Sequence, residues 1–459
     1  MARVRAVLLI DFGSTYTKVA AVDVEGEAIL GVAQSGTTAS EDISIGLERA
    51  VARLRAEIGD VAFAERYACS SAAGGLRMIA SGLVPSLTAE AAKRAALGAG
   101  AKVVRTYSYE LTTEDLSEIA RLKPDIMLLT GGTDGGNRDA ILGNARALTR
   151  LETPFPVVVA GNRAVCEACA GILTGAGREA IRCENVMPTF NQLNIGPAQA
   201  VIRELFLKRI VAGKGLTKAQ ALLDGILMPT PSAVLAALTL FAEDAGELVA
   251  ADLGGATTDI YSITEGLPTR AGTILKGLPE PYAKRTVEGD IGMRYSARGV
   301  LEGAGMAAVC GASGRAEGEV RAWLEKIDRC PDVLAETGAE RDVDRALAAL
   351  AIELGLLRHA GEIEQVFTPM GVAYQQTGKD LTRVMTIVLT GGALVHAENP
   401  EAILRRALAG DHPSSLMPRE ARAVVDRRYI LFAMGLLSGT YRELARKLLK
   451  KEFRYGNSQ

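Results

Sequence analysis

The sequence predicts a duplicated α/β protein, and three observations support this prediction. First, an apolar run followed by Asp-x-Gly and small or hydroxyl residues occurs at Val7–Thr15 and again at Leu248–Thr257. Second, an apolar run that ends in Thr-Gly-Gly occurs at Ile126–Gly132 and at Thr386–Gly392, after the first motif in both cases. Third, strand-length apolar runs alternate with helical patterns, as in layered α/β folds. Two matches in one order indicate an internal duplication.

The elements are expected to follow the same plan in each half. In the first half, an amphipathic helix with Ile43, Leu47, Val51 and Leu54 at helical spacing follows three strands. We expect first-half strands at 6–10, 17–22, 28–33, 66–70, 103–107, 125–130 and 156–160, and second-half strands at 260–262 and 273–276.

The two halves are expected at residues 1–243 and 244–459. The stretch 300–362 is rich in helical pattern and predicts a helical subdomain inserted in the second half. The stretch 216–240 predicts two helices that are separated by Pro229–Ser232, where Thr230 or Ser232 caps the second helix.

The composition excludes several classes of protein. The chain has 459 residues and a net charge of −2, with 48% hydrophobic and 23% charged residues. These values exclude a disordered chain, and no global charge would hold nucleic acid or a membrane surface. Six cysteines do not make a disulfide scaffold, and no apolar run approaches about 18 residues. We therefore expect a reduced, cytoplasmic protein in which any metal is a hard cation on carboxylates.

The two Asp-x-Gly motifs predict tight hairpins that bind phosphate. Glycine lets backbone N–H groups approach a phosphate, and hydroxyl groups add donors. Asp11 and Asp252 stand at strand ends, where a carboxylate can hold Mg²⁺ through its waters. Both hairpins are expected to act on one nucleotide, with catalysis by positioning and charge neutralisation. The predicted phosphate-binding residues are Gly13, Ser14, Thr15, Lys18, Gly254, Gly255, Ala256, Thr257 and Thr258.

Three further candidates have an alternative explanation. Gly391, Gly392 and Ala393 follow a buried run and would let an adenosine lie on the backbone, or they allow close packing of a strand and a helix. Asp134, in a glycine-rich loop, is the most plausible additional catalytic acid, or it forms an Asx turn. Lys18 neutralises phosphate, or it is a solvated lysine.

The motif set resembles the superfamily of actin, sugar kinases and heat-shock chaperone ATPases. Asp11–Thr15 and Asp252–Thr257 resemble its two phosphate motifs, and Leu389–Ala393 resembles its adenosine motif. The segments 231–237 and 433–437 resemble its two connecting helices. The resemblance implies duplicated ribonuclease H-like domains, with a nucleotide cleft between them, that bind ATP and Mg²⁺.

Longer strings are similar to the glutamate mutase accessory proteins, a family often labelled MutL and unrelated to the mismatch-repair protein. They are Thr130–Asn137, Asp252–Asp259, Arg285–Arg294 and Asp426–Leu437. The resemblance implies a reactivating factor that uses ATP to exchange inactive cofactor on an adenosylcobalamin-dependent mutase, such as glutamate mutase or an aminomutase. The sequence departs from chaperone ATPases at Met228 and Thr230, because neither is the glutamate that precedes the first connecting helix in those proteins. We therefore expect slow hydrolysis of ATP.

Two alternative functions remain open at this point. One is a small-molecule kinase of the same fold, although no base for a substrate hydroxyl is evident. The other is an iron–sulfur activator of a 2-hydroxyacyl-CoA dehydratase, which would use Cys166 and Cys169; we expect these cysteines to be structural. Glu288 is expected to open a helix, where it either reaches the nucleotide or caps the helix.

Overall fold

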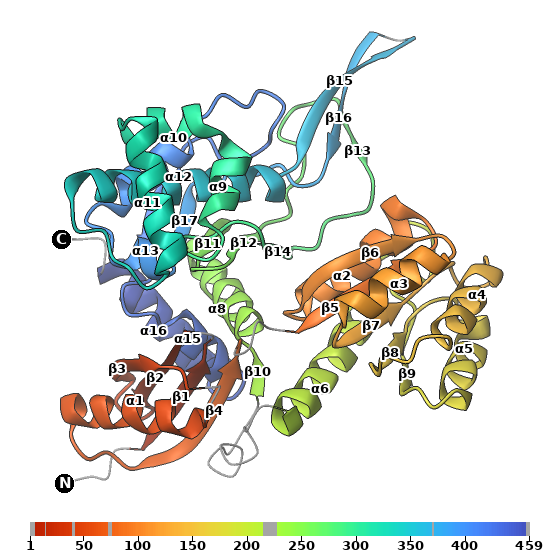
Figure 1. The fold of residues 1–459 in the computed structure, drawn as a ribbon, viewed down its shortest axis with the longest axis horizontal. Helices are drawn as coiled ribbons and strands as arrows, with labels where there is room; N and C mark the ends of the chain where they lie inside the picture. The colour runs from red at the N-terminus through yellow and green to blue at the C-terminus, as the bar shows by residue number, and fades with distance from the viewer. Residues whose placement is uncertain are drawn as a thin grey trace. The chain divides into compact units, whose positions relative to one another are not determined.

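The computed structural model describes residues 5–13, 15–38, 42–71, 76–213, 227–369 and 371–455. The chain divides into two compact units, and Figure 1 labels their helices and strands. The first unit contains Met1–Ala236, Gly277–Pro279 and Phe432–Leu448, and the second contains Ala237–Lys276, Glu280–Leu431 and Leu449–Gln459. Both units combine sheets and helices, which confirms the α/β class.

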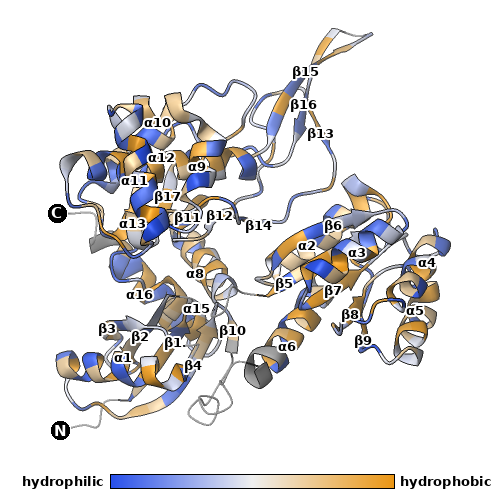
Figure 2. Ribbon diagram, viewed as in Figure 1, coloured by the Kyte–Doolittle hydropathy of each residue, from blue (hydrophilic) through white to orange (hydrophobic). Residues whose placement is uncertain are grey.

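The first unit contains a mixed five-stranded sheet in the order β10-β4-β1-β2-β3. β1, β2 and β3 are antiparallel neighbours, whereas β4 and β10 run parallel to β1. Helix α1 packs its buried Leu47 and Leu54 in the core of this sheet, and the alternation of its hydrophobic and hydrophilic residues is visible in Figure 2. The elements are β1 (Ala6–Phe12), β2 (Tyr16–Asp23), β3 (Ala28–Gly36), α1 (Ile43–Ile58), β4 (Phe63–Ser70) and β10 (Leu227–Pro229).

The second unit repeats this sheet in the order β14-β12-β11-β17-β18. Again three antiparallel strands are followed by two parallel ones. The shared order confirms the duplication and the ribonuclease H-like topology of both sheets. The strands are β11 (Leu248–Leu253), β12 (Thr258–Ile263), β14 (Ala283–Glu288), β17 (Thr386–Thr390) and β18 (Arg422–Val425).

The predicted equivalence of the two motifs that end in Thr-Gly-Gly, Ile126–Gly132 and Thr386–Gly392, is wrong. β17 pairs with β11, and its topological equivalent is β4, which pairs in the same way with β1. The segment Ile126–Leu129 is β7, which belongs to a separate parallel sheet. A buried parallel strand followed by glycine has the same sequence pattern in either sheet, because both of its faces are covered.

That separate sheet lies in the first unit and is entirely parallel, in the order β6-β5-β7-β8-β9. Residues of α2 and α6 pack with Met78, Ala80 and Leu128, whereas residues of α3, α4 and α5 pack with Ile79 and Met127 on the opposite face. Its strands are β5 (Arg77–Gly82), β6 (Lys102–Ser108), β7, β8 (Val157–Val159) and β9 (Ala180–Arg182). Its helices are α2 (Glu90–Gly98), α3 (Thr113–Leu122), α4 (Asp139–Leu148), α5 (Arg163–Gly175) and α6 (Gly196–Gly213), with a π-helical turn η2 at Pro85–Ala89.

The predicted helical stretch of the second unit is confirmed, and a small sheet that the sequence did not predict accompanies it. Trp323 of α11 and Leu347 of α12 lie in the same core. The predicted strand 273–276 is confirmed as β13, which pairs with β16 in this small sheet. The elements are α9 (Ala297–Ala304), α10 (Met306–Ser313), α11 (Glu317–Arg329), α12 (Gly338–His359), β13 (Thr273–Lys276), β15 (Glu362–Thr368), β16 (Gly371–Thr377), α13 (Gly392–Val395) and α14 (Pro400–Ala407).

Two helices match the expected connecting helices. α8 (Thr230–Ala245) follows β10, and α15 (Leu431–Ser438) follows β18. They touch closely, since a Cβ built on Gly435 would lie 1.8 Å from Ala233 O. The first helix expected in 216–240 falls largely outside the described residues, and the last helix is α16 (Arg442–Tyr455). No helix in the described part of the chain is long and apolar enough to cross a membrane.

Candidate functional site

The first Asp-x-Gly motif forms the tight hairpin between β1 and β2. Gly13 N–H donates to Tyr16 O at 3.1 Å, and a Cβ at Gly13 would lie only 2.5 Å from that oxygen. Thr37 holds the hairpin from outside, because its hydroxyl donates to Gly13 O at 2.8 Å and its N–H donates to Thr15 O at 2.9 Å. Ser14 lies outside the described residues. The turn therefore requires glycine at position 13.

Asp11 is the most constrained charged group of this hairpin. Its side chain is at the end of β1 and only 2% exposed. Oδ1 accepts hydrogen bonds from the Thr230 hydroxyl at 2.6 Å and from Cys69 Sγ at 3.6 Å, and Oδ2 lies 3.8 Å from Lys18 Nζ. Burial raises the pKa of the Asp11 carboxyl, while Lys18, Thr230 and Cys69 act in the opposite direction. Lys18 is thus directed at Asp11.

The second Asp-x-Gly motif forms the equivalent hairpin between β11 and β12. Gly254 N–H donates to Thr257 O at 2.9 Å, as Gly13 does in the first hairpin. The segment after β14 holds this loop: Arg294 N–H donates to Gly255 O at 2.8 Å, and Ser296 Oγ donates to Ala256 O at 2.7 Å. Gly255 and Ala256 remain exposed.

The hydroxyl residues of the second hairpin are less available than expected. Thr258 is fully buried, and its hydroxyl donates to Ile291 O at 3.1 Å. Thr257 Oγ1 lies 3.5 Å from Asp259 Oδ2, at the limit of a hydrogen bond. The loop offers backbone groups more readily than it offers these side chains.

Asp252 occupies the position in β11 that Asp11 occupies in β1. In the strand register Asp252 lies opposite Asp259 of β12 and Thr390 of β17, as Asp11 lies opposite Lys18 of β2 and Cys69 of β4. Asp252 is half-buried, so its carboxylate is more accessible than that of Asp11. The two carboxylates are therefore equivalent in topology but differ in their environment.

The third motif packs directly against the second hairpin's strand. Gly391 has φ +94°, and a Cβ there would lie 2.2 Å from Leu253 O, so close packing alone requires this glycine. Gly392 is exposed, with the Tyr429 hydroxyl 3.8 Å from its hypothetical Cβ, and Ala393 follows it in α13. The close-packing explanation accounts for Gly391 and leaves Gly392 and Ala393 as candidate adenosine contacts.

Two predicted acidic residues are engaged by other groups of the protein. Asp134 Oδ1 accepts the N–H of Arg163 and Nδ2–H of Asn185, both at 3.0 Å, and so holds the loop after β7 against the start of α5. Glu288 ends β14 and accepts a hydrogen bond from Arg358 at 2.7 Å. The helix expected at Glu288 begins only at Ala297, because Glu288 belongs to the antiparallel ladder with β12.

Cys166 and Cys169 lie on one buried face of α5. Cys166 Sγ lies 3.4 Å from Val159 O, and burial raises the pKa of the Cys166 thiol and raises that of Cys169 to about 11. No group of three or more His, Cys, Asp and Glu side chains arranged to hold a metal occurs among the described residues. These thiols have the environment of small core side chains.

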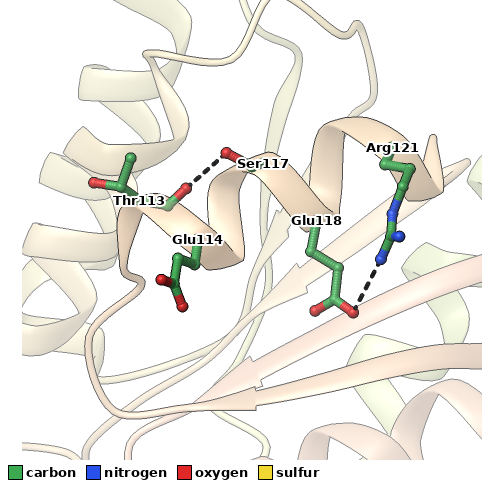
Figure 3. Close-up of a pocket in the computed structure, with 5 residues that line it drawn as sticks. All are labelled: Thr113, Glu114, Ser117, Glu118 and Arg121. Atoms are coloured by element: carbon green, nitrogen blue, oxygen red, sulfur yellow. Dashed lines mark hydrogen bonds and ion pairs between the residues drawn. The ribbon is translucent and has the colours of Figure 1, made fainter.

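A surface depression of about 380 Å³ lies on α3 and is lined by no residue of either hairpin (Figure 3). Thr113, Glu114, Ser117, Glu118 and Arg121 line it. Glu118 accepts the Tyr107 hydroxyl at 2.8 Å and pairs with Arg105 at 3.2 Å, so this carboxylate is already engaged within the protein. It has none of the glycine-rich backbone that a phosphate site needs.

Sequence reasoning missed three residues that order the candidate site. Thr37 and Cys69 contact the first hairpin, and Asp426 accepts Thr390 Oγ1 at 3.2 Å and Ile430 N–H at 2.8 Å, so that it caps α15. Only Asp426 had a sequence signal, an acidic residue between an apolar strand and an apolar helix. Thr37 and Cys69 become visible only through strand pairing.

Each hairpin thus has a carboxylate near a strand end that is followed by a glycine turn, buried at Gly13 in the first hairpin and exposed at Gly255 and Ala256 in the second. Carboxylates of this kind suit Mg²⁺, which usually keeps several waters and takes its remaining ligands from substrate phosphates. Glycine turns suit the phosphates themselves. The residues present fit a magnesium–nucleotide better than they fit a metal enclosed by protein ligands.

Comparisons with known proteins agree with the longer sequence strings. The family model described as MutL protein matches residues 7–453. Protein MutL of Clostridium tetanomorphum is 46% identical over 462 residues, which cover 97% of this chain and 98% of that protein. Among solved structures, the nucleotide-free diol dehydratase-reactivating factor is 11% identical (95% of this chain, 100% of that chain, TM-score 0.39), and xylulose kinase from Lactobacillus acidophilus is 11% identical (98% and 92%, TM-score 0.36). The match over nearly the whole length at this identity shows that the chain belongs to the MutL family.

Proposed function

We propose that this protein is a slow, Mg²⁺-dependent ATPase that reactivates an adenosylcobalamin-dependent mutase by promoting exchange of inactive cofactor. The observation that carries the proposal is the paired carboxylate hairpin. Asp11 and Asp252 lie one residue before the ends of equivalent central strands of two sheets with the same topology, and each strand is followed by a glycine turn. Membership of the MutL family supports the choice of a reactivating factor over other proteins with such hairpins.

In this proposal the two hairpins act on one nucleotide. Backbone N–H groups around Gly13 and Gly254 bind phosphate oxygens, and Asp11 and Asp252 hold Mg²⁺ through water. Bound Mg²⁺ would neutralise phosphate charge. Asp11 would reach the metal only through its second oxygen, which lies 3.8 Å from Lys18 Nζ, because Thr230 and Cys69 already occupy the first. Asp134 is retained as a candidate additional acid, which would have to release Arg163 and Asn185.

Slow hydrolysis follows from the groups before α8. Met228 is apolar, and Thr230 directs its hydroxyl to Asp11, so neither position supplies a carboxylate for an attacking water. The useful output is then a change of state rather than fast turnover. Such a change can act on a partner only if the partner binds one nucleotide state better than the other.

The first experiment measures Mg·ATP affinity and hydrolysis for Asp11→Ala and Asp252→Ala. Loss of one carboxylate from the metal's environment should reduce affinity or turnover at least about tenfold, which corresponds to about 1.4 kcal/mol. Asp60→Ala is the control, because the Asp60 side chain is 93% exposed and lies on a turn outside both hairpins. Unchanged binding and hydrolysis in both hairpin variants would remove the site assignment.

The second experiment tests the partner. An adenosylcobalamin-dependent mutase loaded with a cobalamin that lacks the adenosyl group is mixed with this protein, Mg·ATP and free adenosylcobalamin. Mutase activity and released corrinoid should both recover, and recovery should require ATP and fail with Asp252→Ala. Equal recovery without ATP would refute the reactivating function, and stoichiometric phosphate transfer to a small metabolite would favour a kinase instead.

A further inference from the structure

The parallel sheet of the first unit contributes to the proposed ATP site through Asp134 alone, in the loop after β7, and its topology points to a second site. In chain order its strands are β5, β6, β7, β8 and β9, and their spatial order is therefore 2-1-3-4-5. The direction of strand addition reverses between β5 and β7. Open parallel sheets of this order bind ligands outside the carboxyl ends of their strands at that reversal.

Three loops meet at the carboxyl ends of β5, β6 and β7. Gly131 follows β7, and a Cβ there would lie 3.9 Å from Leu83 N in the loop after β5. Tyr109 follows β6 and donates its N–H to Gly82 O at 3.0 Å and to Leu83 O at 3.1 Å. The loops after the first three strands are therefore in direct contact.

Tyr109 is held in an unusual conformation at this point. Its φ is +66°, which is costly for a bulky side chain, and its side chain is 60% exposed. Asn144 of α4 is only 2% exposed and donates Nδ2–H to Tyr109 O at 2.9 Å, which fixes the turn. The turn thus keeps Tyr109 in an unfavourable backbone conformation and exposes its aromatic ring to solvent next to half-buried Leu83 and Val84. Such a ring is a stacking surface for a planar ligand.

One buried polar group near the same point has no hydrogen-bond partner among the described residues. Ser81, one residue before the end of β5, is fully buried, and its hydroxyl has no hydrogen-bond partner among the described residues. A buried hydroxyl without a partner carries a desolvation cost that a bound polar group would relieve.

The amino terminus of α4 opens onto the same loop. Its N-cap residue, Arg138, is exposed and makes no side-chain capping bond, while Asn137 Oδ1 accepts the Ala140 N–H at 3.1 Å and leaves the other first-turn N–H groups for a ligand. Asn162 holds the loop before it in place by donating to Gly136 O and Asn137 O, each at 3.1 Å. The positive end of a helix beside an exposed guanidinium favours an anionic group such as phosphate.

We propose that this point of the sheet binds a planar heteroaromatic ligand that carries a phosphate, with the ring on Tyr109 and the phosphate at the start of α4. Flavin mononucleotide and the nucleotide portion of a cobalamin share this chemistry. The site uses none of the residues of the Asp-x-Gly hairpins, and it does not depend on the proposed ATPase activity.

The test is equilibrium dialysis of the full chain against flavin mononucleotide and, separately, against cyanocobalamin. One of these two probes should bind saturably. Tyr109→Ala should weaken binding on the order of tenfold through loss of stacking, whereas Tyr109→Phe should keep it within about threefold. Phe367→Ala is the matched control, since Phe367 is an aromatic residue that is 83% exposed on β15. ATP hydrolysis should be unchanged in all three variants.

Ser81→Ala separates binding from folding. Removal of a hydroxyl that has no partner should leave the melting temperature unchanged or raise it. The same change should weaken binding of the probe, because the ligand loses its hydrogen bond to that hydroxyl. Binding of flavin alone or of cobalamin alone identifies the source of the ligand. Absence of binding by both probes, binding insensitive to Tyr109→Ala, or displacement of the probe by Mg·ATP would each overturn the proposal, and none of these results would affect the ATPase test with Asp252→Ala.

Discussion

The contact between Thr230 and Asp11 gives the sharpest test of the first hairpin. Thr230→Val keeps the shape of the side chain and removes the hydroxyl that donates to Asp11 Oδ1 at 2.6 Å. A hydrogen bond to an ionised group contributes about 1.5–3 kcal/mol. Because this bond is short and Asp11 is only 2% exposed, we expect a loss of about 2–3 kcal/mol in the free energy of unfolding of the first unit.

The assay is calorimetric unfolding with Thr230→Ser as the control, since serine keeps the hydroxyl. A loss of this size should lower the melting temperature of the first unit by roughly 5–10 °C. The effect should also depend on pH in a definite direction. Burial raises the pKa of Asp11, and loss of the Thr230 donor raises it further, because the donor stabilises the ionised form. The penalty of Thr230→Val should therefore be full where Asp11 is ionised and should shrink as pH falls through the folded-state pKa of Asp11.

Two results would refute this reasoning. One is an equal melting temperature for the valine and serine variants at neutral pH. The other is a valine penalty that does not change on acidification. Either result would mean that the hydroxyl does not stabilise an ionised Asp11, and the role of this carboxylate near Mg²⁺ would have to be reconsidered.

Three other outcomes are expected. Cys169→Ala should keep ATP hydrolysis within a few-fold of the wild type. Burial raises the pKa of the Cys169 thiol to about 11, so in the wild type this thiol should react with alkylating reagents far more slowly than exposed Cys330. An iron-dependent absorption band that is lost in the variant would contradict this structural role. Gly391→Ala should destabilise the second unit by about 2 kcal/mol or more, because its Cβ would lie 2.2 Å from Leu253 O at φ +94°, and an unchanged melting temperature would count against that close approach. Burial lowers the pKa of Lys379 to about 7, below its value in the unfolded chain, so the unfolded state binds more protons above pH 7. The free energy of unfolding should therefore rise with pH, by up to about 1.4 kcal/mol per pH unit. Denaturant unfolding from pH 7 to 9 should show this rise in the wild type and a flatter profile in Lys379→Met.

The sequence predicted the local chemistry of the hairpins well. The apolar strand that ends in Asp-x-Gly forms the same turn at both of its occurrences in this chain, where the glycine N–H donates to the carbonyl three residues later. The positions of Asp11, Gly13 and Gly254 could therefore be assigned before any strand pairing was known. The helices of 300–362 were predicted equally well, because their apolar residues repeat with the period of a helix.

The predicted equivalence of the two Thr-Gly-Gly motifs was wrong because the sequence pattern of a strand does not indicate which strand pairs with it. Ile126–Leu129 and Thr386–Thr390 are both buried parallel strands before glycines, yet only the second pairs with a hairpin strand. The true counterpart, β4, carries Cys69 where β17 carries Thr390, so residue identity gave no signal of the equivalence.

The sequence by itself determined the class of the protein, its two phosphate-type turns and its family resemblance, because each of these depends on residues close together in the chain. Only the tertiary structure decided which groups surround Asp11, that Asp134 holds the start of α5, and that a separate 2-1-3-4-5 sheet lies in the first unit. Thr230 and Asp11 are 219 positions apart, and burial of a carboxylate against a distant hydroxyl is set by packing of whole elements, which no local pattern specifies.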